Sequence, residues 1–410
     1  MALIVQKFGG TSVADADKIH RAARRAIRAK LDGKKVVLVV SAMGKTTDHL
    51  IDLAHEITPI PPRRELDMLL TTGEQVSIAL MAMAIQSVGH EAISLTGGQL
   101  GLVTDSRHSQ ARIQNISKER IYKELESGRI VIVAGFQGVD ETGEITTMGR
   151  GASDTTAAAL AAVLHAEICE IYTDVDGIYT SDPRVVPEAR KLDAISYDEM
   201  LEMAGAGAGV MHSRAIEFAK KYNVPIHVRS SLTDQPGTMI MEKTPGMEDV
   251  AVRGASLKVD LATIVMTRVP NEPGIAAEIF AEVGKHHIVV DDIIQNFYDD
   301  RKLANVGFST NQDQAREGVE VCRRMAEARG FGPVELDENV SKVSVVGVGM
   351  RSHAAVAAKM FEALRDAKVN IDTISTSEIV ISCIVPQEHG PRALQAVHKA
   401  FELDKAHPTV

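Results

Sequence analysis

The stretch LIVQKFGGTSV, residues 3–13, predicts the first unit of the fold. Leu3–Val5 is a short apolar run suited to a buried strand. Lys7 follows at the expected end of that strand, and Gly9 and Gly10 lack the side chains that would keep a phosphate away from backbone N–H groups. A helical pattern comes next. The stretch therefore predicts a strand, a glycine turn and a helix with an anion site at the turn, although an ordinary tight turn with an incidental lysine fits the same spacing.

Around this stretch the chain has the composition of a large globular protein. Its 410 residues exceed the usual size of one domain and 45% of them are hydrophobic, so we expect two or three domains. The net charge of −10 and the aromatic content of 4% disfavour binding to nucleic acid or to an anionic membrane.

Cysteine and histidine spacing indicates the compartment. The three cysteines lie far apart without a CxxC pair, which predicts free thiols in a reducing environment. The histidines show no zinc-binding pattern, so we assign no metal-ligating residue. No apolar run is long enough to span a bilayer, and the first residues do not resemble a secretory signal. We therefore expect a cytoplasmic protein with no membrane partner.

From residue 1 to about residue 240, short β-branched runs alternate with longer alanine-rich stretches. The expected strands are Leu3–Val5, Val36–Val40, Glu91–Ser94, Ile130–Val133, Glu167–Thr173 and Pro225–Val228. The expected helices include Ile19–Lys30, Gln75–Ser87, Ser117–Ser127 and Thr155–His165. This alternation predicts a mainly parallel sheet between layers of helices. The alternation is lost over Glu242–Lys258, which we interpret as a linker.

An internal repeat follows the linker. Residues 262–293 align without gaps to residues 343–374, with Asp291 opposite Asp372. Each copy has the pattern strand, turn, helix, strand, and further strand material comes after it. The repeat therefore predicts two small β-α-β-β-α-β domains.

Polar residues follow the expected strands of the first part. Ser41 and Thr47 lie in SAMGKTTD, residues 41–48, which is no nucleotide-binding P-loop because Val39 stands where that motif needs glycine. Their hydroxyls could bind a ligand, or they could form the turn and cap the next helix. Glu74, in TTGEQVS, is expected at a helix start, where it either interacts with the helix dipole or binds a substrate ammonium.

Residues 146–162, TTMGRGASDTTAAALAA, combine an arginine with a helix start. Arg150 stands between two glycines, which leaves its guanidinium accessible to a carboxylate or a phosphate. Ser153 and Asp154 begin the helix, and Asp154 could cap it. A helix N-terminus beside an arginine predicts an anion site. A capped helix next to an unrelated arginine is the alternative.

Residues 172–184, YTDVDGIYTSDPR, form a polar loop after a strand. Asp174 and Asp176 could face a metal ion, or they could simply form a turn with Gly177. All these clusters together supply the cations, N–H groups, hydroxyls and acids that Mg²⁺-dependent phosphoryl transfer requires.

In their order along the chain, KFGGTSV, TTGEQVS, GRGASDTTA and TDVDGIYTSDPR, followed by the paired repeats, resemble the aspartate kinases of the amino acid kinase superfamily. The resemblance covers nearly the whole chain and identifies the repeats as similar to ACT domains. It implies an α/β fold with an amino-acid-kinase-like αβα sandwich over residues 1–245. A linker over 246–259 and two ferredoxin-like α+β ACT domains over 260–338 and 339–410 would follow.

The resemblance also implies an activity. ATP, with Mg²⁺, would phosphorylate the side-chain carboxylate of L-aspartate to 4-phospho-L-aspartate, the first step toward lysine, threonine, methionine and isoleucine. Lys7 would neutralise the transferring phosphoryl group and Asp154 would hold Lys7 in place. The implied aspartate-binding residues are Thr47, Glu74, Arg150, Gly151 and Ser153. The implied ATP-binding residues are Lys7, Phe8, Gly9, Gly10, Ser41, Thr173, Asp174, Tyr179, Asp182 and Arg184.

One position departs from the family pattern. Many aspartate kinases have a lysine that helps to hold ATP in a stretch like AKVLHP, whereas this chain has GAGVMHS with Gly209 in the lysine's place. We expect Lys220, Lys221 or a nearby arginine to substitute, unless the nucleotide is bound differently.

The ACT-like repeats imply feedback by lysine and/or threonine at a dimer interface, and hence a homo-oligomer. The implied effector-binding residues are Asn271, Asp292, Gln295 and Asn296 in the first repeat and Ser352, Ser377 and Glu378 in the second. Met247 could also start a separately made regulatory subunit.

Two other functions deserve comparison with this one. A superfamily relative acting on acetylglutamate, glutamate or UMP is disfavoured by KFGGTSV and by the repeats. A catalytically inactive amino-acid-binding regulator is favoured by Gly209 but opposed by Lys7, Glu74, Arg150 and Asp154.

Overall fold

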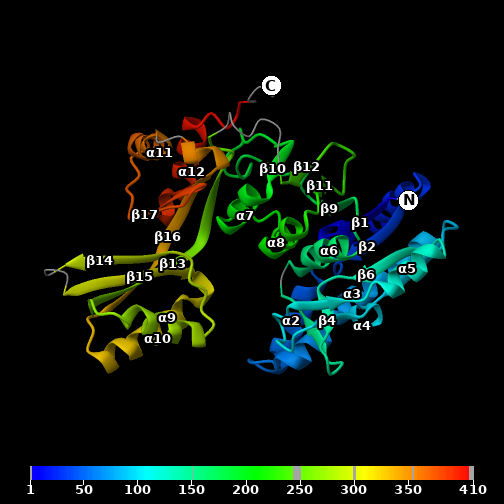
Figure 1. Ribbon diagram of the computed structural model, residues 1–410, viewed down its shortest axis with the longest axis horizontal. Coiled ribbons are helices and arrows are strands. Elements are labelled where there is room, and N and C mark those ends of the chain that lie inside the picture. Colours follow the sequence, from blue (N-terminus) through cyan, green and yellow to red (C-terminus); the bar gives the residue numbers. More distant parts are fainter. Residues whose placement is uncertain (1, 150, 243–250, 299–301, 353–354, 406–410) are drawn as a thin grey trace. The chain divides into compact units, whose positions relative to one another are not determined.

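The computed structural model describes residues 2–149, 151–242, 251–298, 302–352 and 355–405, without the side chains of residues 351 and 352. The chain divides into two units. The first comprises residues 1–179, 191–204 and 209–247, and the second comprises residues 180–190, 205–208 and 248–410. Figure 1 shows the elements of both units.

The first unit is built on an eight-stranded sheet in the order β10-β12-β11-β9-β1-β2-β6-β3. Its strands are β1 (Leu3–Phe8), β2 (Lys35–Val40), β3 (Ala92–Leu95), β6 (Ile130–Ala134), β9 (Ile168–Thr173), β10 (Ala194–Ser196), β11 (Ile226–Ser230) and β12 (Thr238–Met241). Every neighbouring pair is parallel except β11 and β12. The mainly parallel sheet predicted from the sequence is confirmed. β1 lies between β2 and β9, which explains why its apolar residues are buried.

Helices cover both faces of this sheet. α1 (Ala16–Leu31) and α3 (Arg63–Gln86) share one hydrophobic core with β1, β2 and β6. α6 (Ala152–Val163) contacts β1, β2 and β9 from outside that core and packs on α8 (Ser213–Tyr222). The remaining helices are α2 (Thr46–Ile57), α4 (Gly97–Leu100), α5 (Glu119–Glu126) and α7 (Tyr197–Gly205). A separate four-stranded sheet contains β5 (Ile113–Ile116), β4 (Leu102–Thr104), β7 (Gln137–Val139) and β8 (Ile145–Thr147).

α3 differs from the sequence prediction. The helix begins at Arg63 rather than at Gln75, so Glu74 lies inside it, and the expected place of Glu74 at a helix start is wrong. Gly73 lies inside the helix and permits close packing there: a Cβ atom on it would stand 2.9 Å from the Cβ atom of Ala42. α3 is long and apolar enough to cross a membrane by length and composition, but more than half of its most apolar window is buried inside the protein.

The second unit contains a six-stranded antiparallel sheet in the order β14-β15-β13-β16-β18-β17. Its strands are β13 (Gly254–Pro270), β14 (Ile293–Tyr298), β15 (Leu303–Asn311), β16 (Val334–Val346), β17 (Thr373–Thr376) and β18 (Val380–Pro386). α9 (Ile275–Lys285) and α10 (Ala315–Arg329) pack in one core, and α11 (Ala355–Asp366) and α12 (Gly390–Ala400) pack in another.

The two repeats share this sheet because β13 and β16 are long. Residues 254–258 of β13 pair with residues 342–346 of β16, and the later part of β13 pairs with β15. The last residues of the predicted linker, 246–259, belong to β13 from Gly254 onward, and its first residues, 246–250, lie outside the described residues. The expected boundary between residues 338 and 339 falls inside β16.

A segment expected in the catalytic part is built into the second unit. Residues 180–190 place Val186 in the core that contains α11 and α12. The Thr180 hydroxyl lies 3.0 Å from His398 Nε2, and the Gln395 side chain donates to the Val185 carbonyl over 2.8 Å. The polar loop of residues 172–184 is therefore divided between the two units.

Candidate active site

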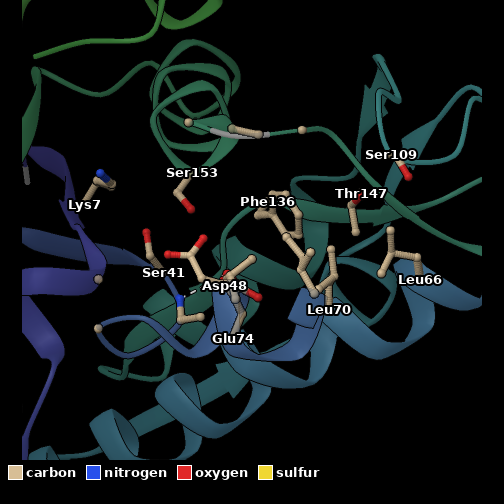
Figure 2. A pocket seen from close by; sticks show the side chains of 18 residues that line it. Lys7, Ser41, Asp48, Leu66, Leu70, Glu74, Ser109, Phe136, Thr147 and Ser153 are labelled. Carbon is tan, nitrogen blue, oxygen red and sulfur yellow. Dashed lines mark hydrogen bonds between the residues drawn. The ribbon is translucent and has the colours of Figure 1, made fainter. Parts of the chain in front are cut away.

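A pocket of about 400 Å³ opens in the first unit, a size suited to small ligands. It lies at the carboxyl ends of β1 and β2, where parallel sheets gather their ligands. Figure 2 shows Lys7 at one end of the pocket, Ser109 and Leu66 at the other, and Ser153, Glu74 and Phe136 between them. Of the predicted site residues, those that line it are Lys7, Gly10, Ser41, Thr47, Glu74, Gly151 and Ser153. Arg150 lies outside the described residues.

Lys7 and Asp154 form an ion pair at one end of the pocket. Lys7 Nζ lies 2.6 Å from Asp154 Oδ1, and the two side chains are only 12% and 9% exposed. Asp154 does not cap α6, contrary to one reading of the sequence, because Gly151 with φ 74° is the N-cap residue and Asp154 lies within the first turn. Its carboxylate is therefore directed to Lys7 rather than to the helix backbone.

The paired glycines have two different surroundings. The Gly9 N–H already donates to the Tyr172 carbonyl over 3.2 Å. A Cβ atom on Gly10 would stand 2.7 Å from the Ala42 carbonyl oxygen, so glycine is needed there for the close packing of the turn after β2. Phe8 is fully buried and stacks on Tyr172 with ring centroids 4.8 Å apart, so its side chain does not face the pocket.

Glu74 is a buried carboxylate, and only one of its two oxygens accepts a hydrogen bond from the described residues. Oε1 accepts the Ala42 N–H over 3.0 Å, whereas Oε2 has no hydrogen-bond partner among the described residues. Burial raises the pKa of Glu74 to about 7, against the opposing effect of the Ala42 hydrogen bond. A cation that entered the pocket would satisfy this oxygen and favour the ionised form.

The other predicted nucleotide contacts are not among the residues that line the pocket. The Thr173 hydroxyl donates to Asp174 over 3.0 Å, and the Tyr179 hydroxyl donates to Asp176 over 2.8 Å. Asp182 and Arg184 belong to the second unit, where the Arg184 guanidinium donates to the Asp182 carboxylate over 2.7 Å.

The expected substitutes for the missing lysine have partners elsewhere. Lys220 pairs with Asp198 over 2.5 Å, and Lys221 lies over the Tyr222 ring. Arg214 donates to the carbonyl oxygens of Met148 and Ala111. Gly209 itself is exposed, and a Cβ atom added to it would meet nothing within 4 Å.

Several residues at the pocket were missed by sequence reasoning. Ser109, Phe136 and Thr147 line it, and the buried Asp67 binds two of them. Phe136 has φ 70°, an uncommon conformation for a bulky residue that often marks a functional site. Thr147 lies in the stretch of residues 146–162 that the sequence analysis singled out, whereas no motif distinguishes Ser109 or Phe136, which long-range contacts place at the pocket.

No cluster of three or more His, Cys, Asp or Glu side chains that could hold a metal occurs within the described residues. The Asp176 carboxylate, one of the two acids considered for a metal, pairs with Lys191 over 3.5 Å and accepts the Tyr179 hydroxyl.

The predicted effector positions lie in the second unit. Asp292 Oδ2 lies 3.2 Å from Lys342 Nζ, which also pairs with Asp291. Gln295 and Asn296 are neighbours on β14 and so point to opposite faces of the sheet. Ser377 accepts the Val380 N–H in the turn between β17 and β18, and Glu378 and Asn271 are exposed. The Ser352 side chain lies outside the described residues.

Comparisons with known proteins agree with this architecture. The amino acid kinase family model matches residues 2–230, and an ACT domain model matches residues 343–401. The chain is 50% identical to an aspartokinase of Bacillus sp. (strain MGA3) over 403 residues, 98% of each chain. Escherichia coli aspartokinase III in complex with aspartate and ADP has a similar structure, with a TM-score of 0.84 at 26% identity over 97% of this chain and 99% of that one. The complex of the same enzyme with lysine and aspartate gives a TM-score of 0.75, also at 26% identity and the same coverage.

Proposed function

The chain belongs to the aspartokinases of the amino acid kinase family, and on that basis we propose that its pocket holds L-aspartate and ATP with Lys7 between the two reacting anions. One observation carries this proposal: a paired lysine and an unpaired buried carboxylate, Glu74, line the same pocket. A lysine suits a phosphoryl group, and an unpaired carboxylate suits an ammonium. An amino acid that accepts a phosphoryl group needs both side chains: a lysine for the phosphoryl group and a carboxylate for its own ammonium.

The reaction needs charge stabilisation rather than a base. The side-chain carboxylate of aspartate is ionised at neutral pH, so its oxygen attacks the γ-phosphorus with no proton to remove. The new O–P bond forms as the bond between the γ-phosphorus and the bridging oxygen breaks, and ADP leaves with that electron pair. Lys7 offsets the repulsion between the two anions, and Asp154 keeps its ammonium in place.

Aspartate would lie toward Glu74. Its ammonium would meet the unpaired Oε2, and the Thr47 and Ser153 side chains would add polar contacts. Arg150 would hold the α-carboxylate. Trapping of the acyl phosphate as a hydroxamate from ATP, Mg²⁺ and aspartate tests this assignment, with acetylglutamate, glutamate and UMP as competing acceptors. Product with another acceptor but not with aspartate would refute it, and no product with any would favour an inactive regulator.

ATP would lie toward Lys7, Gly9, Gly10 and Ser41, with Thr173, Asp174, Tyr179, Asp182 and Arg184 as further contacts. A Cβ atom on Gly9 would stand 3.4 Å from Lys7 Nζ, so glycine keeps the surroundings of the ammonium open for an anion. Mg²⁺ would neutralise the phosphates when bound. Binding of an ATP analogue with and without Mg²⁺, measured by calorimetry, tests both parts. Equal affinity in the two conditions would contradict a role for the ion.

The second unit would bind lysine and/or threonine as feedback inhibitors through Asn271, Asp292, Gln295 and Asn296 in the first repeat and Ser352, Ser377 and Glu378 in the second. The lysine complex of the Escherichia coli relative supports this type of regulation. Inhibition assays with each amino acid singly and with both together test it. No inhibition in any combination would refute this part.

We also propose that two or more copies associate through the second unit. β14 is an edge strand of the sheet, and its Ile293 and Phe297 side chains lie on one face and are more than half exposed. Phe297→Lys should shift the mass measured by light scattering toward the monomer. An unchanged mass would remove this strand from the interface.

A separately made regulatory chain starting at Met247 would lack residues 180–190, including Val186, which fills part of the core of the second unit. Such a chain would expose the apolar surface that Val186 covers in the full-length protein. Intact-mass analysis of the native enzyme tests whether it exists. We place the enzyme in the cytoplasm, because all three cysteines are free and buried.

A further inference from the structure

Asp67 is a fully buried carboxylate behind the pocket. It belongs to α3 and accepts the backbone N–H groups of Ser109 and Thr147, each at 3.0 Å from Oδ2. It also accepts the Thr147 hydroxyl at 2.6 Å and the Ser109 hydroxyl at 3.3 Å. The His108 ring lies against it, with Nδ1 at 2.9 Å from Oδ2. One carboxylate therefore holds a loop and the last residue of β8 together.

Arg214 approaches the same two segments from α8. Its guanidinium donates to the Met148 carbonyl over 2.9 Å and to the Ala111 carbonyl over 3.1 Å. The segments also contact each other, because the Ala111 N–H donates to the Thr147 carbonyl over 2.9 Å. Asp67 thus binds donors and Arg214 binds acceptors on one pair of backbone segments.

These segments form the far wall of the pocket. Ser109, Thr147 and Gly149 line it. A Cβ atom on Gly149 would stand 3.3 Å from the Ser109 carbonyl oxygen, so the two segments run close together there. A small shift of either segment would change the shape of the pocket. Neither Asp67 nor Arg214 lines the pocket itself.

We propose that Asp67 and Arg214 are positioning residues that fix the wall formed by Ser109 and Thr147 around aspartate. Burying a carboxylate is costly unless it is hydrogen-bonded, and this one is bonded almost entirely to the wall. The guanidinium completes the arrangement by binding carbonyl groups that the carboxylate cannot bind. The inference rests on the proposed binding of aspartate in this pocket, at the end away from Lys7.

Asp67→Asn tests the carboxylate with almost no change in side-chain volume. Its amide nitrogen would face N–H groups instead of accepting them, so the wall should loosen. We expect the KM for aspartate to rise at least tenfold while the KM for ATP stays within twofold. Asp52→Asn, the same change at an exposed position on α2, should leave both constants unchanged.

Arg214 provides a second, independent variant. Arg214→Met should raise the KM for aspartate in the same selective way, and Arg214→Lys should recover part of the loss because a lysine can donate to one of the two carbonyls. Arg24→Met, the same change at an exposed position on α1, is the control and should leave both constants unchanged. A selective rise in the KM for aspartate supports the inference, whereas an unchanged KM, or equal rises for both substrates in folded variants, overturns it.

Amide hydrogen exchange separates this inference from the proposed function, since it needs no substrate. Asp67→Asn should speed exchange at least fivefold in peptides covering residues 105–112 and 145–149 but not in β1. Unchanged exchange there would overturn the inference even if aspartate is the substrate. If the wild-type enzyme used another acid, the proposed function would fail, and the exchange result would still decide whether Asp67 holds the wall.

Discussion

Two charged regions of the pocket differ in how their charges are paired. We call the region of Lys7 and Asp154 the first end and the region of Glu74 the second end. At the end assigned to phosphate, Lys7 and Asp154 lie 2.6 Å apart and neutralise each other before any ligand arrives. At the end assigned to the substrate ammonium, Glu74 is buried with one carboxylate oxygen unpartnered among the described residues. The ion pair holds the lysine in place. Burying the ionised carboxylate without a partner is costly, and either a proton or a cationic ligand relieves that cost. This difference fits the roles proposed above, in which Lys7 stabilises the transition state and Glu74 selects the substrate.

Lys7→Ala should remove the cation from the phosphate-binding region and cause the largest loss of activity among these variants. We expect kcat to fall by about 10³-fold or more, because the variant loses the cation between the two anions. Steady-state kinetics and a thermal melt together measure this. Lys18→Ala, at a partly exposed lysine on α1 that pairs with Asp15, is the matched control and should retain full activity.

Stability must be separated from chemistry in this test, since Lys7→Ala leaves Asp154 buried and unpaired. The double variant Lys7→Ala/Asp154→Asn should recover stability but not turnover. Activity near the wild-type level in either variant would remove Lys7 from the mechanism.

Glu74→Gln should remove the negative charge proposed to bind the substrate ammonium, with a smaller effect on turnover than Lys7→Ala. We expect the KM for aspartate to rise roughly 10- to 100-fold, because an ammonium would lose a charged partner. The wild-type KM should also fall as the pH rises from 6 to 8, since ionisation of Glu74 with its pKa of about 7 prepares the site. The variant should lose this pH dependence. Glu65→Gln, exposed on the same helix, should keep it.

Glu74→Gln should weaken the binding of aspartate but stabilise the folded protein at high pH. The folded-state pKa of Glu74 lies above the ordinary value of 4.5, so its contribution to stability is fully present below pH 4.5 and is lost as the pH rises through about 7. At pH 8 without ligand, Glu74→Gln should therefore be more stable than the wild type by about 1–3 kcal/mol. Equal stability in denaturant titrations would show that the buried charge costs nothing.

Gly10→Ala and Gly9→Ala test whether the two glycines near Lys7 have different roles, one in packing and one in ATP binding. The Gly10 variant should lose about 1–3 kcal/mol of stability because its Cβ atom would meet backbone at 2.7 Å. The Gly9 variant should fold normally, because the nearest atom to its Cβ is the flexible Lys7 Nζ. Its defect should instead appear in the KM for ATP. Equal melting temperatures for the two variants would contradict these separate roles.

Gly209→Lys should have the smallest effect on folding, because the surrounding space is open. If the family lysine helps to hold ATP, the KM for ATP should fall about two- to fivefold while the melting temperature stays constant. Gly209→Met, of similar length without the charge, is the control. Equal KM values for the two variants would mean that this enzyme binds ATP without that contact.

Short stretches of the sequence determined much of the first end. Leu3–Val5 predicted a buried strand, and the paired glycines and Lys7 after it predicted a turn with a cation, because these features depend on neighbours in the chain. The alternation of strands and helices predicted the parallel sheet, and the repeat predicted two related halves of the second unit. The resemblance to aspartate kinases then linked Lys7 with Asp154, which are far apart in the sequence.

Only the tertiary structure decided the second end and the division between the units. Glu74 was expected at a helix start, whereas α3 begins at Arg63 and tertiary packing buries the Glu74 carboxylate in the middle of the helix. Asp67 and Arg214 carry no sequence signal, because their partners come from other segments of the chain. Likewise, only packing could assign residues 180–190 to the second unit, where Val186 joins its core. The local sequence pattern thus determined the strands, the helices and their motifs. Burial and long-range contacts decided which charged side chains are paired within the protein and which are left to bind a ligand.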